Sequence, residues 1–217
     1  MNCTIVDFGM GNLRSIQHKM LRMEIPCEVS SEPAEVARAG VLVLPGVGHF
    51  ARGMANLRKL GLIELLHQKV IVEKTPVMGV CLGMQLFSKW SEEGDVEGLG
   101  WIDAVTRRFR FGAAQLHLKI PHVGWNEICP VRASPLLNEV HSRQRFYFTH
   151  SYHVVCHNQA DVLATTSYGY DFVSCVEQAH IFGTQFHPEK SHRRGMELVR
   201  NFVRHAAPLA GSGHAAS

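Results

Sequence analysis

The first half of the chain alternates between short apolar runs and segments with helical periodicity. The apolar runs cover residues 4–8, 41–44 and 77–80. Short continuous runs of this kind are typical of strands that are buried on both faces of a sheet. Between them, apolar residues recur every three or four positions within residues 13–21 and 54–66, as on one face of a helix. Strands separated by helices predict an α/β fold with a mostly parallel central sheet flanked by helices.

Beyond Gly100 the pattern changes to short strand-like runs with few helical stretches between them. This pattern predicts an antiparallel extension of the sheet or a small second sheet in the C-terminal half. Helical periodicity returns over residues 197–205 and is absent from residue 208 onward. We therefore expect a single domain over residues 1–207 and a disordered tail over residues 208–217. The strand-like runs cover residues 101–111, 146–149, 152–156, 162–166, 172–177 and 181–186.

Composition places the chain among ordinary globular proteins. It has 217 residues, of which 46% are hydrophobic and 19% charged, enough for one domain with a substantial core. A formal net charge of +3 without a long basic run gives no indication of nucleic-acid binding. No apolar run approaches the ~20 residues that span a bilayer, so no membrane segment is expected.

The cysteines and histidines indicate a reduced protein without a metal. Six cysteines are scattered along the chain without a C-x-x-C pair, and the first residues carry no signal-peptide pattern. This combination predicts free thiols in the cytoplasm and not a disulfide framework. None of the 14 histidines lies in a metal-ligand spacing such as H-E-x-x-H, so we expect neither a metal site nor a cofactor.

The third apolar run ends in Gly79-Val-Cys81-Leu-Gly83, and an amphipathic segment follows from Met84 to Trp90. Small residues around a central nucleophile are typical of a nucleophile elbow, a tight and strained turn from a strand into a helix. A cysteine at such a turn sits beside the helix N-terminus, where unpaired N–H groups and the helix dipole favour the thiolate. The alternative is a buried structural cysteine, which is the usual state of an intracellular cysteine.

A cysteine nucleophile needs a base that takes its proton and later returns it to the leaving group. The strand-like run over residues 181–186 leads to His187, which is followed by Pro188 and Glu189. Glu189 is placed where a carboxylate orients the imidazole, the third role in a catalytic triad. The alternative is that one of 14 histidines lies near a strand end by chance.

The second apolar run is followed by the glycine-rich loop Pro45-Gly-Val-Gly48. Acyl transfer to sulfur creates a tetrahedral oxyanion, which preorganised backbone N–H groups stabilise. Leu82, directly after the nucleophile, supplies one such group, and the glycine-rich loop can supply a second. The alternatives are a plain βα turn or a phosphate-binding loop, although no Gly-Lys-Ser/Thr follows. All three motifs lie at the C-terminal ends of predicted parallel strands, where open α/β sheets place their ligands.

With these motifs the chain resembles the triad-type glutamine amidotransferases, through Gly-Val-Cys81-Leu-Gly-Met-Gln85 and Gln-Phe-His187-Pro-Glu189. Finer matches resemble one group of this family, the glutaminase subunits of imidazole glycerol phosphate synthases. The most specific match is Pro121-His-Val-Gly-Trp-Asn126, which sister glutaminases usually lack. The matches run in order from residue 7 to 191 and also include Asp7-Phe-Gly-Met-Gly-Asn12-Leu, Pro45-Gly-Val-Gly48, Ser91-Glu-Glu93-Gly, Tyr147-Phe-Thr-His150-Ser-Tyr152 and His187-Pro-Glu-Lys-Ser191.

The resemblance implies that Cys81 attacks the side-chain amide of glutamine, releasing ammonia and then glutamate through a thioester. It assigns proton transfer to His187 and the orientation of that imidazole to Glu189. The residues implied to form the oxyanion hole are Leu82 with Val47 or Gly48. The residues implied to hold glutamine are Gln85, Glu93 and the backbone of Ser151 and Tyr152.

The motifs span residues 45–189 and leave no room for a second domain that uses the ammonia. A glutaminase acting alone would waste glutamine, so a separate synthase partner is expected. The resemblance implies a (β/α)8-barrel cyclase that receives ammonia through its core and makes imidazole glycerol phosphate and an aminoimidazole carboxamide ribotide in histidine biosynthesis. Asn12 and Lys190 are candidates for the heterodimer interface. Their alternatives are a helix-start turn and a solvated lysine.

Three other interpretations stay open on the sequence alone. Residues 108–111, Arg-Phe-Arg-Phe, and the segment over residues 118–122 also resemble paralogous glutaminases that supply ammonia to sugar-modifying synthases in surface-polysaccharide biosynthesis. A catalytically silent binding or regulatory subunit would be expected to lack a triad member, whereas all three are present. A different cysteine hydrolase with the same elbow would act without glutamine and would not need the His-Pro-Glu motif.

Overall fold

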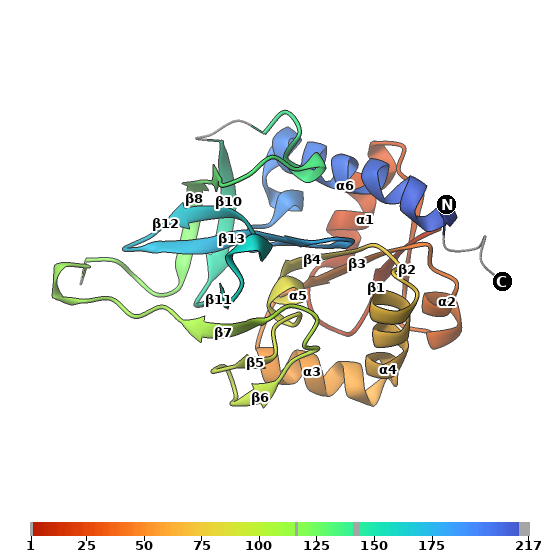
Figure 1. The fold of residues 1–217 in the computed structure, drawn as a ribbon, viewed down its shortest axis with the longest axis horizontal. Helices are drawn as coiled ribbons and strands as arrows, with labels where there is room; N and C mark the ends of the chain where they lie inside the picture. The colour runs from red at the N-terminus through yellow and green to blue at the C-terminus, as the bar shows by residue number, and fades with distance from the viewer. Residues whose placement is uncertain (1, 116, 141–143, 213–217) are drawn as a thin grey trace.

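An eight-stranded sheet forms the centre of the computed structural model, which describes residues 2–115, 117–140 and 144–212 (Figure 1). The first five strands in spatial order pair in parallel, and the remaining strands pair antiparallel. This confirms the α/β fold with a mostly parallel sheet and an antiparallel extension. The order is β2 (Cys27–Ser30), β1 (Cys3–Val6), β3 (Val41–Gly46), β4 (Val77–Cys81), β14 (Ile181–Thr184), β13 (Asp171–Gln178), β12 (Val162–Ser167) and β9 (Cys129–Pro130).

The strands β1, β3 and β4 form from the apolar runs of the sequence, and every residue in them is buried. They can be apolar throughout because helices cover both faces of the sheet. Strand β2 differs, because it reads Cys-Glu-Val-Ser, lies at the sheet edge and is only partly buried. Since its residues form no apolar run, the sequence predicted neither β2 nor the short helix after it, α2 (Pro33–Ala37).

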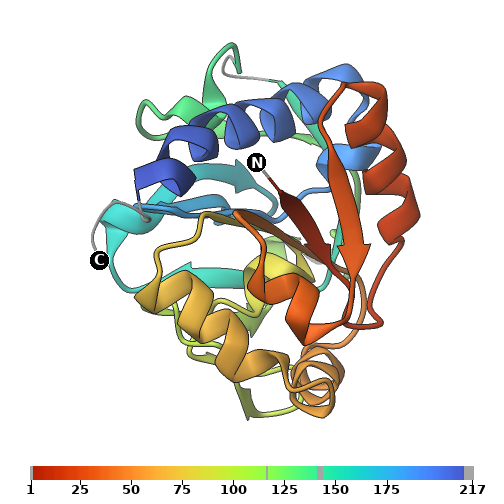
Figure 2. The ribbon, with the colours of Figure 1, turned by 90° about the vertical axis from the view of Figure 1, so that its right-hand side faces the viewer.

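The longer helices lie in two layers (Figure 2). Helices α1 (Leu13–Arg22) and α6 (His192–Ser212) lie on one face of the sheet, and α3 (Phe50–Lys59) and α4 (Leu62–His67) lie on the other. Each of α1, α3 and α4 presents buried apolar residues on one side. Among the described residues, no helix is both long and apolar enough to cross a membrane. The remaining helical turns are the π-helix η1 (Gln68–Val72), α5 (Leu82–Gln85) and the 3-10 helices η2 (Ala113–Gln115), η3 (Pro135–Leu137), η4 (Gln159–Asp161) and η5 (Pro188–Lys190).

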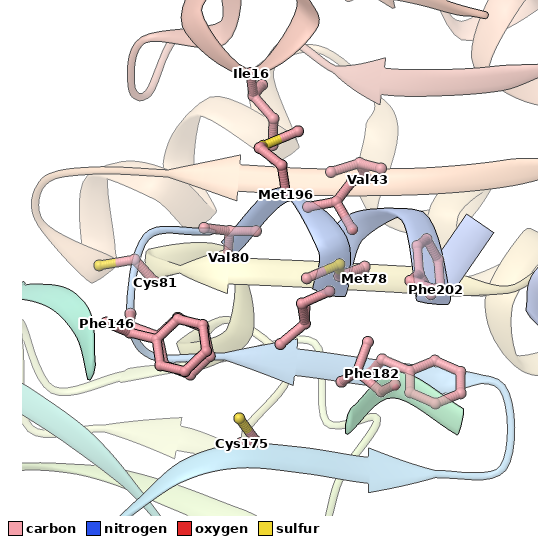
Figure 3. Close-up of a cluster of buried hydrophobic side chains, with 14 of the residues drawn as sticks. Ile16, Val43, Met78, Val80, Cys81, Phe146, Cys175, Phe182, Met196 and Phe202 are labelled. Atoms are coloured by element: carbon pink, nitrogen blue, oxygen red, sulfur yellow. The ribbon is translucent and has the colours of Figure 1, made fainter. Parts of the chain in front are cut away.

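Two apolar clusters fill the space between the sheet and the helices. They are separate because alternate residues of a strand point to opposite faces of the sheet. Figure 3 shows the cluster that contains Val43, Met78 and Phe202. Cys81 lies at the edge of this cluster, with its sulfur pointing away from Val80 and Met78 (Figure 3). The strand that carries Cys81 is therefore anchored in the core, while the thiol itself lies at the core boundary.

Two small sheets accompany the antiparallel half (Figure 1). Strand β8 was not predicted, because its polarity is inverted: Val123 and Trp125 are exposed, whereas His122 is buried. A pattern in which apolar residues point outward does not resemble a strand that packs on a core. One small sheet pairs β10 (Arg145–His150) with β8 (His122–Glu127), and the other has the order β11 (Tyr152–Cys156), β7 (Ala104–Arg108), β5 (Trp90–Ser91) and β6 (Val96–Glu97).

The C-terminal helix is longer than the sequence predicted. We expected a disordered tail over residues 208–217, but α6 continues to Ser212, and residues 213–217 lie outside the described part of the chain. The expectation rested on the absence of apolar periodicity from residue 208 onward. Ala206 is still buried in the apolar cluster, which anchors the helix up to the point where the periodicity ends.

Candidate active site

The ends of three neighbouring parallel strands bring the predicted motifs together. Strand β4 lies between β3 and β14, with Cys81 paired to Gly46 of β3 and Val80 paired to Thr184 of β14. The chain leaves β3 into the glycine-rich loop and leaves β14 toward His187, so both segments depart beside Cys81. Open parallel sheets place their ligands at this carboxyl edge.

Cys81 adopts the strained backbone of a nucleophile elbow. Its φ of 54° and ψ of −109° lie in a region that residues with a side chain rarely occupy. Close backbone contacts explain the surrounding glycines. A Cβ on Gly83 would lie 1.6 Å from the Leu44 carbonyl oxygen, and one on Gly79 would lie 2.6 Å from the Met84 nitrogen. The turn therefore packs so tightly against β3 and α5 that only glycine fits at these two positions.

Replacing Gly83 with alanine should destabilise the elbow. The new methyl group meets a backbone carbonyl, which cannot rotate away as a side chain can, so we expect a loss of about 3 kcal/mol or more in the free energy of unfolding. Urea denaturation measures this loss. The control is Gly112→Ala, where the nearest atom is the flexible Gln115 side chain at 3.3 Å. It should change stability by less than ~0.5 kcal/mol, and equal losses in both variants would contradict this account.

The helix after Cys81 is shorter than the sequence indicated. The amphipathic pattern extends toward Trp90, but α5 ends at Gln85 and Trp90 begins β5. A single helical turn sums few peptide dipoles, so its field at the sulfur is smaller than that of a long helix. The dipole therefore contributes less to forming the thiolate than we expected, and a nearby cation has to contribute more.

His187 and Glu189 form a buried hydrogen-bonded pair. His187 Nδ1 donates to Glu189 Oε1 at 2.8 Å. The short helix η5 allows this contact because it turns the chain back on itself directly after the imidazole. The Ser191 hydroxyl fixes the turn by donating to the His187 carbonyl and accepting from the Tyr147 N–H. The imidazole is thus held with Nδ1 protonated.

Electrostatics favour a protonated His187. Burial of the imidazole lowers its pKa, but the Cys81 thiolate and the Glu189 carboxylate more than offset this and raise the pKa to about 10. His187 Nε2 is buried and has no hydrogen-bond partner of standard geometry among the described residues. A protonated Nε2 beside the Cys81 sulfur is what an imidazolium–thiolate pair requires.

A cavity of about 220 Å³ adjoins Cys81. Its lining brings together residues from the glycine-rich loop, the elbow and the segment after β10. The roles of these residues stay predictions, but the structure gathers them around one space beside the thiol. The sequence-predicted residues in the lining are Val47, Gly48, Leu82, Gln85, Glu93, Ser151 and Tyr152.

Two predicted glutamine-binding side chains are already held by the protein. Gln85 Nε2 donates to the Tyr152 carbonyl at 2.8 Å and to Gln185 Oε1 at 3.0 Å. These bonds use both of its hydrogens, so the Gln85 carbonyl oxygen is the atom left for a ligand. Glu93 Oε2 accepts from the Phe50 N–H at the start of α3 at 2.8 Å.

Gln185 is a site residue that the sequence reasoning missed. It is fully buried, and its Nε2 donates toward Cys81 Sγ at 3.7 Å. Because it lies two residues before His187, at the end of the strand predicted over residues 181–186, strand alternation could have placed it on the same face. Other lining residues belong to motifs of the resemblance but had received no role: Pro121, Thr149 and His150.

Asn12 and Lys190 are not part of the cavity lining. The Asn12 side chain accepts from the Ser15 N–H and caps α1. Lys190 Nζ lies over the Tyr147 ring, 5.7 Å from its centroid. Both residues are exposed. Their contacts fit a helix-start turn and a solvated lysine, so their role at an interface stays a prediction.

The sequence matches the family model of class-I glutamine amidotransferases over residues 4–206. It is 44% identical over 202 residues to a Methanococcus maripaludis protein named imidazole glycerol phosphate synthase subunit HisH 2, which covers 93% of this chain and 98% of that one. A Pseudomonas aeruginosa protein of the same name is 42% identical over 199 residues, covering 92% and 97% of the two chains.

Solved structures share the fold at lower sequence identity. The crystal structure of a glutamine amidotransferase superimposes with a TM-score of 0.70 at 19% identity, covering 96% of this chain and 98% of that one. A glutamine amidotransferase from Thermotoga maritima superimposes with a TM-score of 0.63 at 15% identity, covering 99% and 90% of the two chains. These likenesses extend the agreement to the arrangement of strands and helices.

The family match covers the elbow, the glycine-rich loop and the His-Pro-Glu turn alike. These are the segments that meet at the carboxyl ends of β3, β4 and β14, beside the cavity. The relatives named HisH match the chain over nearly the same length. The chain therefore belongs to the class-I glutamine amidotransferase family, within the group of HisH subunits of imidazole glycerol phosphate synthase.

Proposed function

We propose that the chain is the glutaminase subunit of an imidazole glycerol phosphate synthase. It hydrolyses glutamine to glutamate and ammonia and passes the ammonia to a partner in histidine biosynthesis. The observation that carries the proposal is the convergence of Cys81 with the His187–Glu189 pair at one strand edge, beside a cavity of about 220 Å³. The names of the similar proteins support the same reaction.

The first half-reaction transfers the glutamyl group to sulfur. The Cys81 thiolate attacks the side-chain carbonyl carbon of glutamine, and the carbonyl electrons move onto oxygen. The N–H of Leu82 and an N–H from Val47 or Gly48 stabilise this oxyanion. The C–N bond then breaks as His187 gives its Nε2 proton to the leaving nitrogen. Ammonia departs and a thioester remains on Cys81.

The second half-reaction hydrolyses the thioester. His187, now neutral, takes a proton from water at Nε2 while the water oxygen attacks the thioester carbon. Collapse of the tetrahedral intermediate expels the Cys81 thiolate, releases glutamate and restores the imidazolium–thiolate pair. Glu189 accepts from Nδ1 throughout, which holds the ring and stabilises its positive charge.

The partner that fits this reaction is a (β/α)8-barrel cyclase that uses ammonia to make imidazole glycerol phosphate and an aminoimidazole carboxamide ribotide. We place Asn12 and Lys190 at the interface with it. The six cysteines are free thiols, as in proteins of a reducing compartment, and we place the reaction in the cytoplasm.

A sugar-modifying synthase of surface-polysaccharide biosynthesis is the second candidate for the ammonia acceptor. Both similar proteins carry the number 2 in their names, and residues 108–111 resemble glutaminases that serve such synthases. The glutaminase site would be the same in either case. Only the partner protein that receives the ammonia would change.

The test is to mix the purified chain with each candidate synthase from the same organism and glutamine. The histidine-pathway cyclase, supplied with its ribotide substrate, should accelerate glutamate release and yield imidazole glycerol phosphate. Acceleration only by the sugar-modifying synthase would reassign the acceptor. If glutamate is released with neither partner, the glutaminase function is refuted.

A further inference from the structure

Two buried histidines face each other beside the glutamine cavity. His150 ends β10, His122 begins β8, and the two residues are direct partners in the antiparallel pair. His122 Nδ1 and His150 Nε2 lie 3.1 Å apart. The Phe148 ring stacks on His122 and the Phe172 ring packs against His150. Polar rings buried in this way need defined hydrogen-bond partners.

The contacts of the two rings determine where their protons lie. His150 Nδ1 lies 2.8 Å from the Tyr152 carbonyl oxygen, which can only accept, so this nitrogen carries the hydrogen. In a neutral ring Nε2 is then the acceptor, so His122 Nδ1 donates to it. His122 Nε2 accepts from the Asn126 amide at 3.3 Å. A second contact fixes the orientation of this amide without reference to His122, because Asn126 Nδ2 also donates to the Ser167 carbonyl.

This assignment requires both rings to be neutral, and their burial favours the neutral form. Burial lowers the pKa of His122 to about 4. It also lowers the pKa of His150 well below 6.5, and the nearby His153 and His187 add to this shift. Each ring therefore offers one donor and one acceptor at neutral pH, and the hydrogens of the chain point from Asn126 toward Tyr152.

The Tyr152 carbonyl joins this chain to the cysteine. The same oxygen accepts from Gln85 Nε2 at 2.8 Å, and Gln85 is linked through Gln185 to Cys81 Sγ. His150 and Tyr152 both line the glutamine cavity. The carbonyl thus receives one donor from the histidine side and one from the elbow side, which fixes the cavity wall between them.

We propose that His122 and His150 are positioning residues, both protonated at Nδ1, that hold the Tyr152 carbonyl and the glutamine-binding segment over residues 151–152. This inference rests on the glutaminase function proposed above. The two rings act through the Tyr152 carbonyl and take no part in the proton transfers assigned to His187. Their loss should therefore weaken glutamine binding more than it slows the thioester chemistry.

Imidazole ¹⁵N NMR of the full chain, labelled at histidine, tests the proton positions in the wild-type protein. We expect the rings of His122 and His150 each to have a protonated Nδ1 and a bare Nε2 at neutral pH. The variants His122→Asn and His150→Asn assign them by removing one signal set each. A ring protonated at Nε2, alone or together with Nδ1, would overturn the proposal for that histidine.

Glutamine kinetics of the chain with its synthase test the positioning role. His122→Leu removes the donor to His150, and we expect KM for glutamine to rise about 10-fold while kcat changes less than ~3-fold. Asparagine places its Nδ2 where histidine has Nδ1, so His122→Asn should return KM to within about 3-fold of wild type. The exposed His157, changed to leucine, is the control and should keep the wild-type KM.

The two proposals fail in different ways. If the wild-type chain does not hydrolyse glutamine with any partner, the proposed glutaminase function is refuted. The NMR experiment still decides the proton positions of the two histidines. If the wild-type chain is active and KM for glutamine is unchanged in His122→Leu, only the positioning role is refuted. If His122→Leu does not fold, the wild-type spectrum still decides whether the hydrogen-bonded chain exists.

Discussion

Replacing Cys81 with alanine should abolish glutamine hydrolysis, with turnover falling by about 10⁴-fold or more. Without the sulfur there is no nucleophile to form the thioester, and His187 alone has nothing to activate but water. The fold should survive, because the side chain lies at the edge of its apolar cluster (Figure 3). Glutamate release by the chain with its synthase measures the effect. Cys129→Ala, at the exposed cysteine, is the control and should keep wild-type turnover.

Alkylation provides a second test of the Cys81 thiol. Burial raises the pKa of Cys3 and of Cys156 to about 12, so these thiols stay protonated and unreactive at neutral pH. Cys81 lines a cavity and sits beside an imidazolium, so a glutamine-like electrophile should label it first. Excess glutamine should protect it. Labelling spread over several cysteines, or full turnover by the Cys81→Ala variant, would argue against a special thiol at this position.

Changing Glu189 to glutamine should lower kcat by about 10³- to 10⁴-fold. Glutamine can still accept a hydrogen bond from His187 Nδ1 but carries no charge, so the imidazolium loses its stabilising partner. The change is nearly isosteric, and the glutamine cavity does not include this residue, so KM should change little. Steady-state kinetics separate the two parameters. A variant with reduced stability but unchanged kcat would show that Glu189 is structural and not part of the triad.

The same pair should make the stability of the chain depend on pH. The pKa of His187 is raised from 6.5 to about 10 in the folded state, so the folded chain binds this proton more tightly than the unfolded chain. The contribution of His187 to the free energy of unfolding is fully present below about pH 6.5 and is lost as the pH rises toward about 10. In Glu189→Gln one of the two stabilising negative charges is gone, so urea unfolding should show a shallower decline. Equal slopes in both proteins would contradict the assigned pair.

The parallel half of the sheet was predictable because its strands are buried on both faces. A run such as residues 41–44 has no polar position and can only be accommodated between two helical layers. Strand β8 was not predictable in this way. It buries His122, which a hydrogen bond to His150 makes tolerable, and it exposes Val123 and Trp125. Pattern analysis assumes that apolar residues point inward, so a strand that buries a polar network is read as a loop.

The triad was predictable because each member lies in a motif that has a recognisable local backbone. The elbow needs glycines around Cys81, and the turn after β14 brings Glu189 back to His187. Gln185 and His150 also lie in recognised motifs, but the motifs do not give their roles, because these roles arise from contacts between distant segments. Gln185 meets Cys81 across 104 residues of sequence. Only the strand register shows that these segments meet.

The parallel pairing of β14 with β4 also determines when the site can appear during synthesis. Cys81 leaves the ribosome about a hundred residues before the residues that follow β14, since Gln185 lies 104 positions after it. Closing so long a loop is slow and has to wait for the later segment to emerge. Until β14 and η5 are available, the thiol has no base and no neighbouring carboxylate. An unfinished chain therefore cannot consume glutamine, and ammonia release begins only with a completed fold.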